Sequence, residues 1–227
     1  MCTILLRLDP TSATPIVLAA NRDEFRDRAA DDPFALAPGC FAGRDRRAGG
    51  TWLAVGRTRL AALTNIRDAP RRPDARSRGV LPLAALDGTL PARFDAWNAF
   101  NLLVIDRDGA RVTTHLAAGD TLGPVSLGPG THVIVNEPFG AATCTRAAHA
   151  GRLLGDATPD FAHLENHGPP LEVGLCHHGE VYGTVSSTVV ALDRVYRVVA
   201  YRPRAGLPCR TATQDLTAAA RAATGGP

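Results

Sequence analysis

MCTILLRLDPTSATPIVLAANRDEF, residues 1–25, contains two apolar runs separated by residues that favour a turn. The runs TILLRL (3–8) and PIVLAA (15–20) predict two β-strands, because each is short, apolar and bounded by Asp, Pro, Ser or Thr. Two such strands joined by a short connection predict an antiparallel hairpin at the start of the chain.

The hairpin predicts which side chains meet at its open end. If the turn centres near Ser12, the numbers of facing residues sum to about 24, so Cys2 lies across from Arg22. Asp23 follows directly. We therefore expect a thiol, a guanidinium and a carboxylate to lie close together, although a charged cluster at the end of a hairpin is also typical of solvated surface.

The rest of the chain continues the hairpin pattern. Apolar runs bounded by turn residues predict further strands at 51–55, 59–66, 100–106, 110–116, 131–136, 181–192 and 194–201. Helical patterns are fewer and lie at 79–87, 143–154 and 211–223, and the polar segment 67–78 predicts a long surface loop. These patterns favour an α+β fold of antiparallel sheets in one domain, 1–227, with a disordered tail at 224–227.

Composition excludes several classes of protein. The formal net charge of +3 is too mild to indicate nucleic-acid binding, and all 25 basic residues are Arg. The five Cys are odd in number and form no CxxC pair, which favours a reducing, cytoplasmic location over a disulfide framework. The N-terminal apolar run is broken by Arg, Asp and Pro, so we expect neither a signal peptide nor a membrane span. The oligomeric state stays open.

Cys2 has a special chemical position. A small second residue permits removal of the initiator Met, which would leave Cys2 with both a thiol and a free α-amine. The reference pKa of an α-amine is about 7.7–8.0 and that of a thiol about 8.5, so the amine can accept the thiol proton. Arg22 would favour the thiolate, and Asp23 would orient the amine or the guanidinium.

Several sequence blocks resemble the NRDE family, also called the transport and Golgi organization protein 2 family. The blocks are the first 25 residues, AGRDRRAGGTWLAVGRTRLAALTNIR at 42–67, SRGVL at 77–81, FNLLVID at 100–106 and YGTVSSTVV at 182–190. They extend over nearly the whole chain. The resemblance implies a four-layer αββα sandwich similar to that of N-terminal-nucleophile hydrolases.

The resemblance also implies site residues. In related cysteine amidohydrolases, which cleave penicillin V and conjugated bile salts, an N-terminal Cys attacks an amide. Cys2 would then be the nucleophile, flanked by Arg22 and Asp23, with Asn65 and Asn136 as candidates to polarise the carbonyl. The residues expected to bind a ligand around them are Asn21, Glu24, Trp52, Arg76 and Arg78, although Trp52 also fits a core position.

The chain departs from the family pattern in two places. One is IVNEPFGAATC at 134–144, where family members commonly have LSN and a downstream PWP-like segment; the other is Val185. Family members commonly have Arg where this chain has Val185, and an Arg at this place helps to shape the active site of the amidohydrolases. A non-catalytic carrier is therefore a second hypothesis, because family members are linked to haem trafficking and to acyl-CoA handling. No cofactor is expected for the hydrolase, whereas haem is possible for the carrier.

The segment 44–78 has a strong excess of positive charge. It contains ten Arg against three acidic residues and leads into and out of the predicted hairpin that ends at Asn65. This pattern predicts a small anionic ligand at the Cys2 cleft, bordered by some of Arg67, Arg71, Arg72, Arg76 and Arg78. The alternative is an ordinary solvated loop.

Two groups of residues have the composition of metal ligands. Cys176, His177 and His178 are consecutive, but neighbouring residues of a strand point to opposite faces, so three ligands do not converge easily. His163 and His167 are four residues apart, but the stretch ends in Gly-Pro-Pro and favours a helix end. We therefore predict no metal site.

Overall fold

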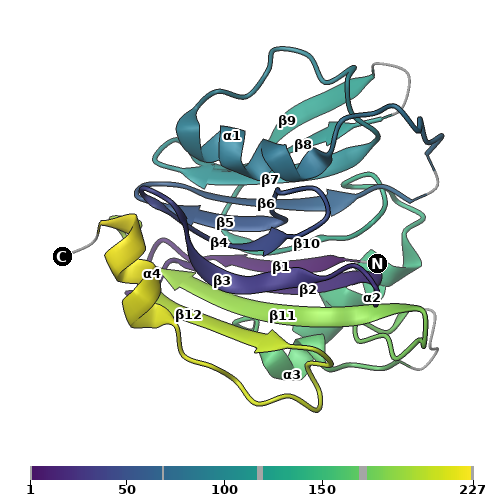
Figure 1. Cartoon of the computed structure of the whole chain (residues 1–227). Helices are drawn as coiled ribbons and strands as arrows, with labels where there is room; N and C mark the ends of the chain where they lie inside the picture. The colour runs from purple at the N-terminus through teal and green to yellow at the C-terminus, as the bar shows by residue number, and fades with distance from the viewer. Residues whose placement is uncertain (1, 68, 117–119, 169–172, 226–227) are drawn as a thin grey trace.

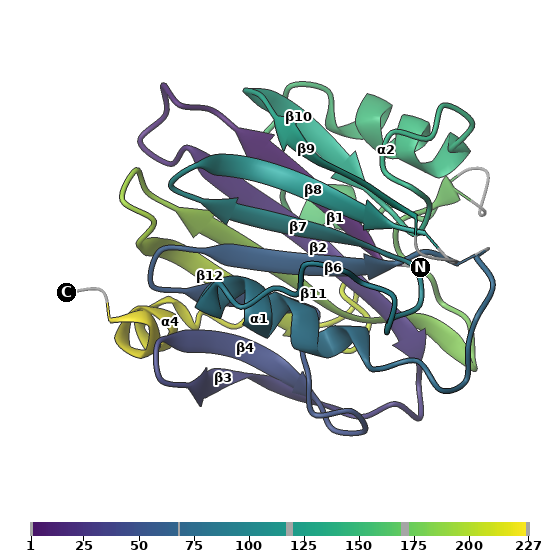
Figure 2. The same ribbon diagram turned by 90° about the horizontal axis from the view of Figure 1, so that it is seen from above.

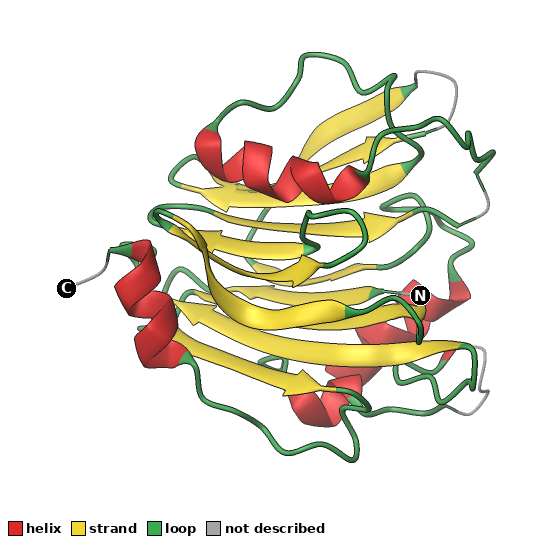
Figure 3. Ribbon diagram, viewed as in Figure 1, coloured by secondary structure: helices red, strands yellow, loops and turns green. Residues whose placement is uncertain are grey.

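The computed structural model describes residues 2–67, 69–116, 120–168 and 173–225. Two antiparallel sheets lie face to face, with helices outside them (Figures 1 and 3). In spatial order, the five-stranded sheet contains β10 (Gly130–Ile134), β1 (Thr3–Leu8), β2 (Ile16–Phe25), β11 (Tyr182–Leu192) and β12 (Val198–Ala205). The seven-stranded sheet contains β3 (Ala30–Ala37), β4 (Cys40–Asp45), β5 (Leu53–Gly56), β6 (Leu60–Asn65), β7 (Phe100–Asp106), β8 (Gly109–His115) and β9 (Thr121–Leu127).

The register of the first hairpin is the predicted one. Thr3 pairs with Asn21 and Leu8 with Ile16, so the numbers of facing residues sum to 24. The turn between them is fixed by Asp9, whose side chain accepts hydrogen bonds from the backbone and the hydroxyl of Thr11. This register brings the start of β1 beside the second half of β2.

The main core lies between the two sheets. Ile4, Leu6 and Leu18 from the five-stranded sheet pack with Leu60 and Leu103 from the seven-stranded sheet, and all five are at most 3% exposed. Alternate residues of each strand face this core. Leu5 and Ala19, on the other face, are buried as well, which is why these strands appear in the sequence as continuous apolar runs.

The helices cover outer surfaces (Figures 1 and 2). The helix α1 (Leu81–Asp87) follows the short 3-10 helix η1 (Arg78–Val80) and packs on the seven-stranded sheet with Phe94, Trp97 and Phe100. On the opposite side, α2 (Thr145–Leu154) and α3 (Phe161–Leu164) cover Leu5 and Ala19 of the five-stranded sheet. The helix α4 (Thr217–Thr224) contacts β12 of one sheet and β3 and β4 of the other. Within the described ranges, every helix is too short or too polar to cross a lipid bilayer.

The sequence patterns missed some elements and misplaced others. The strands β3 and β9 are the edges of their sheet and contain Pro33 and Pro124, so they lack the apolar alternation of a buried strand. The strand β4 and the four-residue α3 were also missed. The strand expected at 194–201 begins only at Val198, because residues 193–197 form a turn in which Tyr196 has φ 64°. Thr224 ends α4, whereas residues 226–227 of the expected tail lie outside the described residues.

Candidate functional site

A cavity of about 690 Å³ opens where β1 begins and β6 ends, and Cys2 and Asn65 line it from opposite sheets. Arg22 and Trp52 lie on its wall, and the 3-10 helix η1 before α1 contributes Arg78. Among the described residues, the lining contains seven Arg and three acidic residues, an excess of four positive charges. The cavity therefore suits an anionic molecule.

Cys2 lies within reach of the residues predicted to flank it. Its Sγ is 3.7 Å from the carbonyl oxygen of Asp23 and donates a weak hydrogen bond to it. Burial raises the pKa of the Cys2 thiol, and the nearby Arg22 acts in the opposite direction without cancelling the effect. At neutral pH this cysteine is therefore a thiol.

Arg22 belongs to a network of charged and aromatic side chains. Its guanidinium carbon lies 4.6 Å from the centre of the Trp52 ring, and its Nη2 lies 3.4 Å from Asp45 Oδ2. Arg28 donates to the same Asp45 oxygen at 2.7 Å and lies 3.5 Å from Glu24. Asp45 also accepts hydrogen bonds from the backbone of the turn that follows it. The network fixes the direction of Arg22 across the cavity.

The carboxylate of Asp23 lies on the opposite face of β2 from Arg22, because successive side chains of a strand alternate. Its Oδ1 accepts a hydrogen bond of 2.6 Å from Thr184, and its Oδ2 lies 3.6 Å from Arg146 and 3.9 Å from the ring of His177. The backbone carbonyl of Asp23 accepts the hydrogen bond from Cys2, and the negative charge of its carboxylate acts on the same thiol. Cys2, Arg22 and Asp23 all line the cavity, with the side chains of Arg22 and Asp23 on opposite faces of β2.

Burial dominates the electrostatics behind Asp23. Burial, with the nearby Arg146 acting in the same direction, lowers the pKa of His177 to about 4, so the imidazole is neutral at neutral pH. Arg146 is 4% exposed and donates to Thr3 Oγ1 at 3.0 Å. Burial also lowers the pKa of Arg146, while Asp23 acts in the opposite direction. The Asp23 carboxylate is thus the natural counter-charge of Arg146.

The two predicted carbonyl-polarising residues lie differently. Asn65 lines the cavity, whereas Asn136 does not occur among the described lining residues. The amide of Asn136 donates a 2.6 Å hydrogen bond to the backbone oxygen of Asn65. Asn101, which is fully buried, holds the same region through bonds to Thr64 and to the backbone of Val135. Asn136 therefore supports the backbone of Asn65.

The loop arginines lie largely where the sequence predicted. Arg71, Arg72, Arg76 and Arg78 line the cavity, whereas Arg67 lies against the ring of Tyr182. The guanidinium of Arg78 donates to the Ala99 backbone at 2.7 Å, and that of Arg76 stacks 5.2 Å from the centre of the Trp97 ring. Burial lowers the pKa of Arg78 to about 10, which leaves it charged at neutral pH.

Of the ten residues expected at the site, eight line the cavity and two, Asn21 and Asn136, do not occur among its described lining residues. Eight line the cavity, namely Cys2, Arg22, Asp23, Glu24, Trp52, Asn65, Arg76 and Arg78. Asn21 does not, because its amide donates to the backbone of Leu164 and Leu175 and its oxygen accepts from Ser187. Sequence reasoning missed Arg28, Asp45 and Arg146. The conspicuous block GRDRRAGG, which contains Asp45, could have indicated that residue, but Arg146 lies in an ordinary helical pattern.

The chain matches the family model described as Transport and Golgi organisation 2 over residues 1–166. The Transport and Golgi organization protein 2 homolog of Bos taurus is 29% identical over 247 residues, covering 85% of this chain and 89% of that protein. The Mus musculus and Homo sapiens homologs are each 31% identical over 157 residues, covering 60% of this chain and 57% of those proteins. The chain thus spans a little more than half the length of the mouse and human relatives. Because the family model covers well over half of the chain, the chain belongs to the Transport and Golgi organisation 2 family.

Proposed function

We propose that this protein is a cysteine hydrolase that cleaves an amide or acyl bond of a small anionic substrate, with Cys2 as its N-terminal nucleophile. The observation that carries the proposal is the position of Cys2 in an arginine-rich cavity of about 690 Å³, opposite Asn65. Such a volume accommodates a small molecule, and the Arg side chains suit a carboxylate or phosphate.

The proposed fold type fits this chemistry. Helices outside two stacked antiparallel sheets, with a cysteine at the start of a central strand, support a four-layer sandwich of the N-terminal-nucleophile hydrolase kind. The five free cysteines support the proposal that the protein works in the reducing cytoplasm.

The proposed reaction requires removal of Met1. The α-amine of Cys2 would take the thiol proton while the sulfur bonds to the carbonyl carbon, and the amide of Asn65 would donate to the oxygen that becomes negative. The C–N bond then breaks, and the amine passes the proton to the leaving nitrogen. Water completes the cycle by displacing the sulfur from the acyl carbon.

A non-catalytic carrier of haem or acyl-CoA is the second candidate, and two observations favour it. Burial raises the pKa of the Cys2 thiol, so the nucleophilic thiolate is scarce. Val185, which replaces an arginine of the family pattern, lies at a bulge between Thr184 and Ser186 and lines a neighbouring cavity of about 350 Å³. Both candidate functions use the same arginine-rich cavity and the same kind of anionic ligand.

Intact mass and turnover distinguish the two functions. The hydrolase requires that purified protein lack Met1 and that Cys2→Ala abolish cleavage of a p-nitroanilide bearing a terminal carboxylate, while the circular dichroism spectrum stays unchanged. Cys2→Ser would keep a small fraction of the rate, since a hydroxyl is the poorer nucleophile. Retained Met1, or turnover that survives in Cys2→Ala, would refute the nucleophile. A Soret shift on addition of haem that is lost in Cys2→Ala would support the carrier.

The charge of the cavity is tested separately from the nucleophile. We expect Arg76→Gln with Arg78→Gln to weaken binding of the carboxylate probe at least about tenfold and to leave its neutral carboxamide analogue nearly unaffected. Arg152→Gln with Arg202→Gln is the matched control, because both residues are exposed and lie outside the lining. Equal losses for the two probes would contradict recognition by charge.

A further inference from the structure

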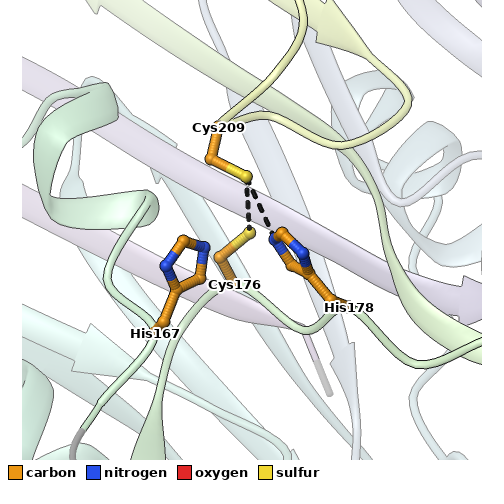
Figure 4. Close-up of side chains that lie close together, drawn as sticks. All are labelled: His167, Cys176, His178 and Cys209. Carbon is orange, nitrogen blue, oxygen red and sulfur yellow. Dashed lines mark hydrogen bonds between the residues drawn. The ribbon is translucent and has the colours of Figure 1, made fainter.

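A second group of reactive side chains lies apart from the arginine-rich cavity. His167, Cys176, His178 and Cys209 come from three separate segments of the chain and point toward one another (Figure 4). Each offers one atom of the kind that zinc prefers, two thiol sulfurs and two imidazole nitrogens. We propose that these four residues bind a zinc ion.

The distances suit a tetrahedral ion. The four candidate ligand atoms lie within 4.8 Å of one another. The sulfurs of Cys176 and Cys209 are 3.8 Å apart, and His178 Nε2 is 3.0 Å from the Cys209 sulfur. Tetrahedral zinc, with Zn–S of about 2.3 Å and Zn–N of about 2.0–2.1 Å, places its ligand atoms roughly 3.3–3.8 Å apart. Small side-chain rotations are therefore enough to close the shell.

The two cysteines do not form a disulfide. A disulfide requires sulfurs about 2.05 Å apart, far less than the 3.8 Å between Cys176 and Cys209. The rings of His167 and His178 meet edge to face, with centres 4.7 Å apart. Two thiols and two imidazoles from three segments of the chain are thus gathered at one point.

The backbone around the four residues is held in place by its own bonds. The backbone N–H groups of Leu175 and Cys176 both donate to the carbonyl oxygen of Asn166, at 2.7 and 2.9 Å. A Cβ at Gly174 would lie 2.7 Å from the backbone of His167, so the two segments approach as closely as glycine allows. Arg204 donates to the carbonyl oxygen of Pro208, beside the fourth residue, at 2.9 Å. The ligand positions are therefore supported independently of a metal.

The sequence argument against a metal at Cys176-His177-His178 was right about one residue and incomplete about the others. His177 turns away, toward Asp23, but residues 176–178 lie outside the strands, so the alternation expected of a strand is not the reason. Cys176 and His178 share the other side, where His167 and Cys209 join them. Nothing in the spacing of the four residues linked Cys209 to the rest.

The zinc would hold the segment that carries His177. The backbone N–H of His177 donates to Thr184 Oγ1 at 2.9 Å, and the Thr184 hydroxyl donates to Asp23. Because Cys176 and His178, the two neighbours of His177, would both bind the ion, zinc would fix this series of hydrogen bonds behind the Cys2 cavity. The proposed role is structural, because all four positions of the ion are filled by protein.

Metal analysis tests the proposal. Protein purified under reducing conditions, incubated with zinc sulfate and desalted should retain one zinc ion per chain by mass spectrometry. The double variant Cys176→Ser with Cys209→Ser should lose it, with affinity at least about a hundredfold weaker. Cys144→Ser is the matched control: that cysteine caps α2 and lies outside the group, and serine is a good cap. The control should bind zinc like the parent protein.

A second measurement keeps the proposal falsifiable if the double variant folds poorly. Cobalt(II) added to the parent protein should give the strong visible bands of a tetrahedral site and a thiolate charge-transfer band, and zinc should displace both. Zinc should also raise the unfolding temperature of chelator-treated protein. The proposal is overturned if the parent protein binds no more zinc than the double variant, or if cobalt gives no thiolate band. If a Cys176–Cys209 disulfide is detected in the purified protein, it is reduced and zinc is added again. The proposal is equally overturned if the reduced protein then binds no zinc.

Discussion

Replacement of Asn101 by alanine should remove much of the stability of the cavity wall. The residue is fully buried on β7. Its amide nitrogen donates to Thr64 Oγ1 at 3.1 Å and to the backbone oxygens of Val135 at 3.0 Å and Glu137 at 2.8 Å. Its amide oxygen accepts from Thr114 Oγ1 at 2.9 Å and from the backbone nitrogen of Phe139 at 3.1 Å. The amide has two hydrogens, so these contacts amount to about four full bonds. At roughly 1 kcal/mol each, Asn101→Ala should cost about 4 kcal/mol of unfolding free energy.

Urea unfolding followed by tryptophan fluorescence measures this loss. With a slope of about 2–3 kcal/mol per molar urea, the midpoint should fall by about 1.3–2 M. Asn98→Ala is the control, because the Asn98 amide makes two hydrogen bonds to the backbone of Arg72 at a half-exposed site. A midpoint for Asn101→Ala within about 0.5 M of that control would refute the idea that the buried bonds stabilise the wall.

Three further outcomes follow from particular residues. Because burial raises the pKa of Cys2, its alkylation by iodoacetamide at neutral pH should be slower than that of free cysteine and should accelerate above about pH 9. Peptide mass mapping measures the rate at Cys2, and fast alkylation at neutral pH would contradict the prediction. Gly50→Ala should lower the unfolding temperature, with a cost of roughly 1–3 kcal/mol, since its Cβ would lie 2.4 Å from the facing backbone, whereas Gly128→Ala, with nothing within 4 Å, should change little. Hydrogen bonds from Arg111 hold the pKa of Asp106 below its usual value, so Asp106 adds stability above about pH 4 that is lost as the pH falls through the lower folded pKa. The Asp106→Asn variant should be less stable than the parent protein at neutral pH, and its urea midpoint should change less than that of the parent between about pH 5 and pH 3. Identical pH profiles of the two proteins would count against this reasoning.

The sequence predicted the centre of the fold better than its margins. Leu5, Leu18 and Leu103 sit in strands buried on both sides, so their apolar pattern follows directly from burial. The edge strands β3 and β9 carry Pro and many exposed residues, and sequence alone cannot distinguish them from loops.

The site shows the same division between local and distant information. Cys2 and Arg22 were placed by the register of one hairpin, which depends only on the first 25 residues. Arg146 and Cys209 reach their neighbours from other parts of the chain, through packing of α2 and of the loop after β12. The local pattern of one sequence does not show which distant segments pack together, so neither residue could be assigned a partner in advance.

The order of strands in the smaller sheet bears on when the protein can assemble during synthesis. The first hairpin ends up in the middle of that sheet, between β10 and β11, whose residues are translated much later. Until those strands emerge from the ribosome, both edges of the hairpin stay open. The first hairpin therefore completes its pairing only after most of the chain has been made, and a chain truncated before β11 would leave that edge open to aggregation.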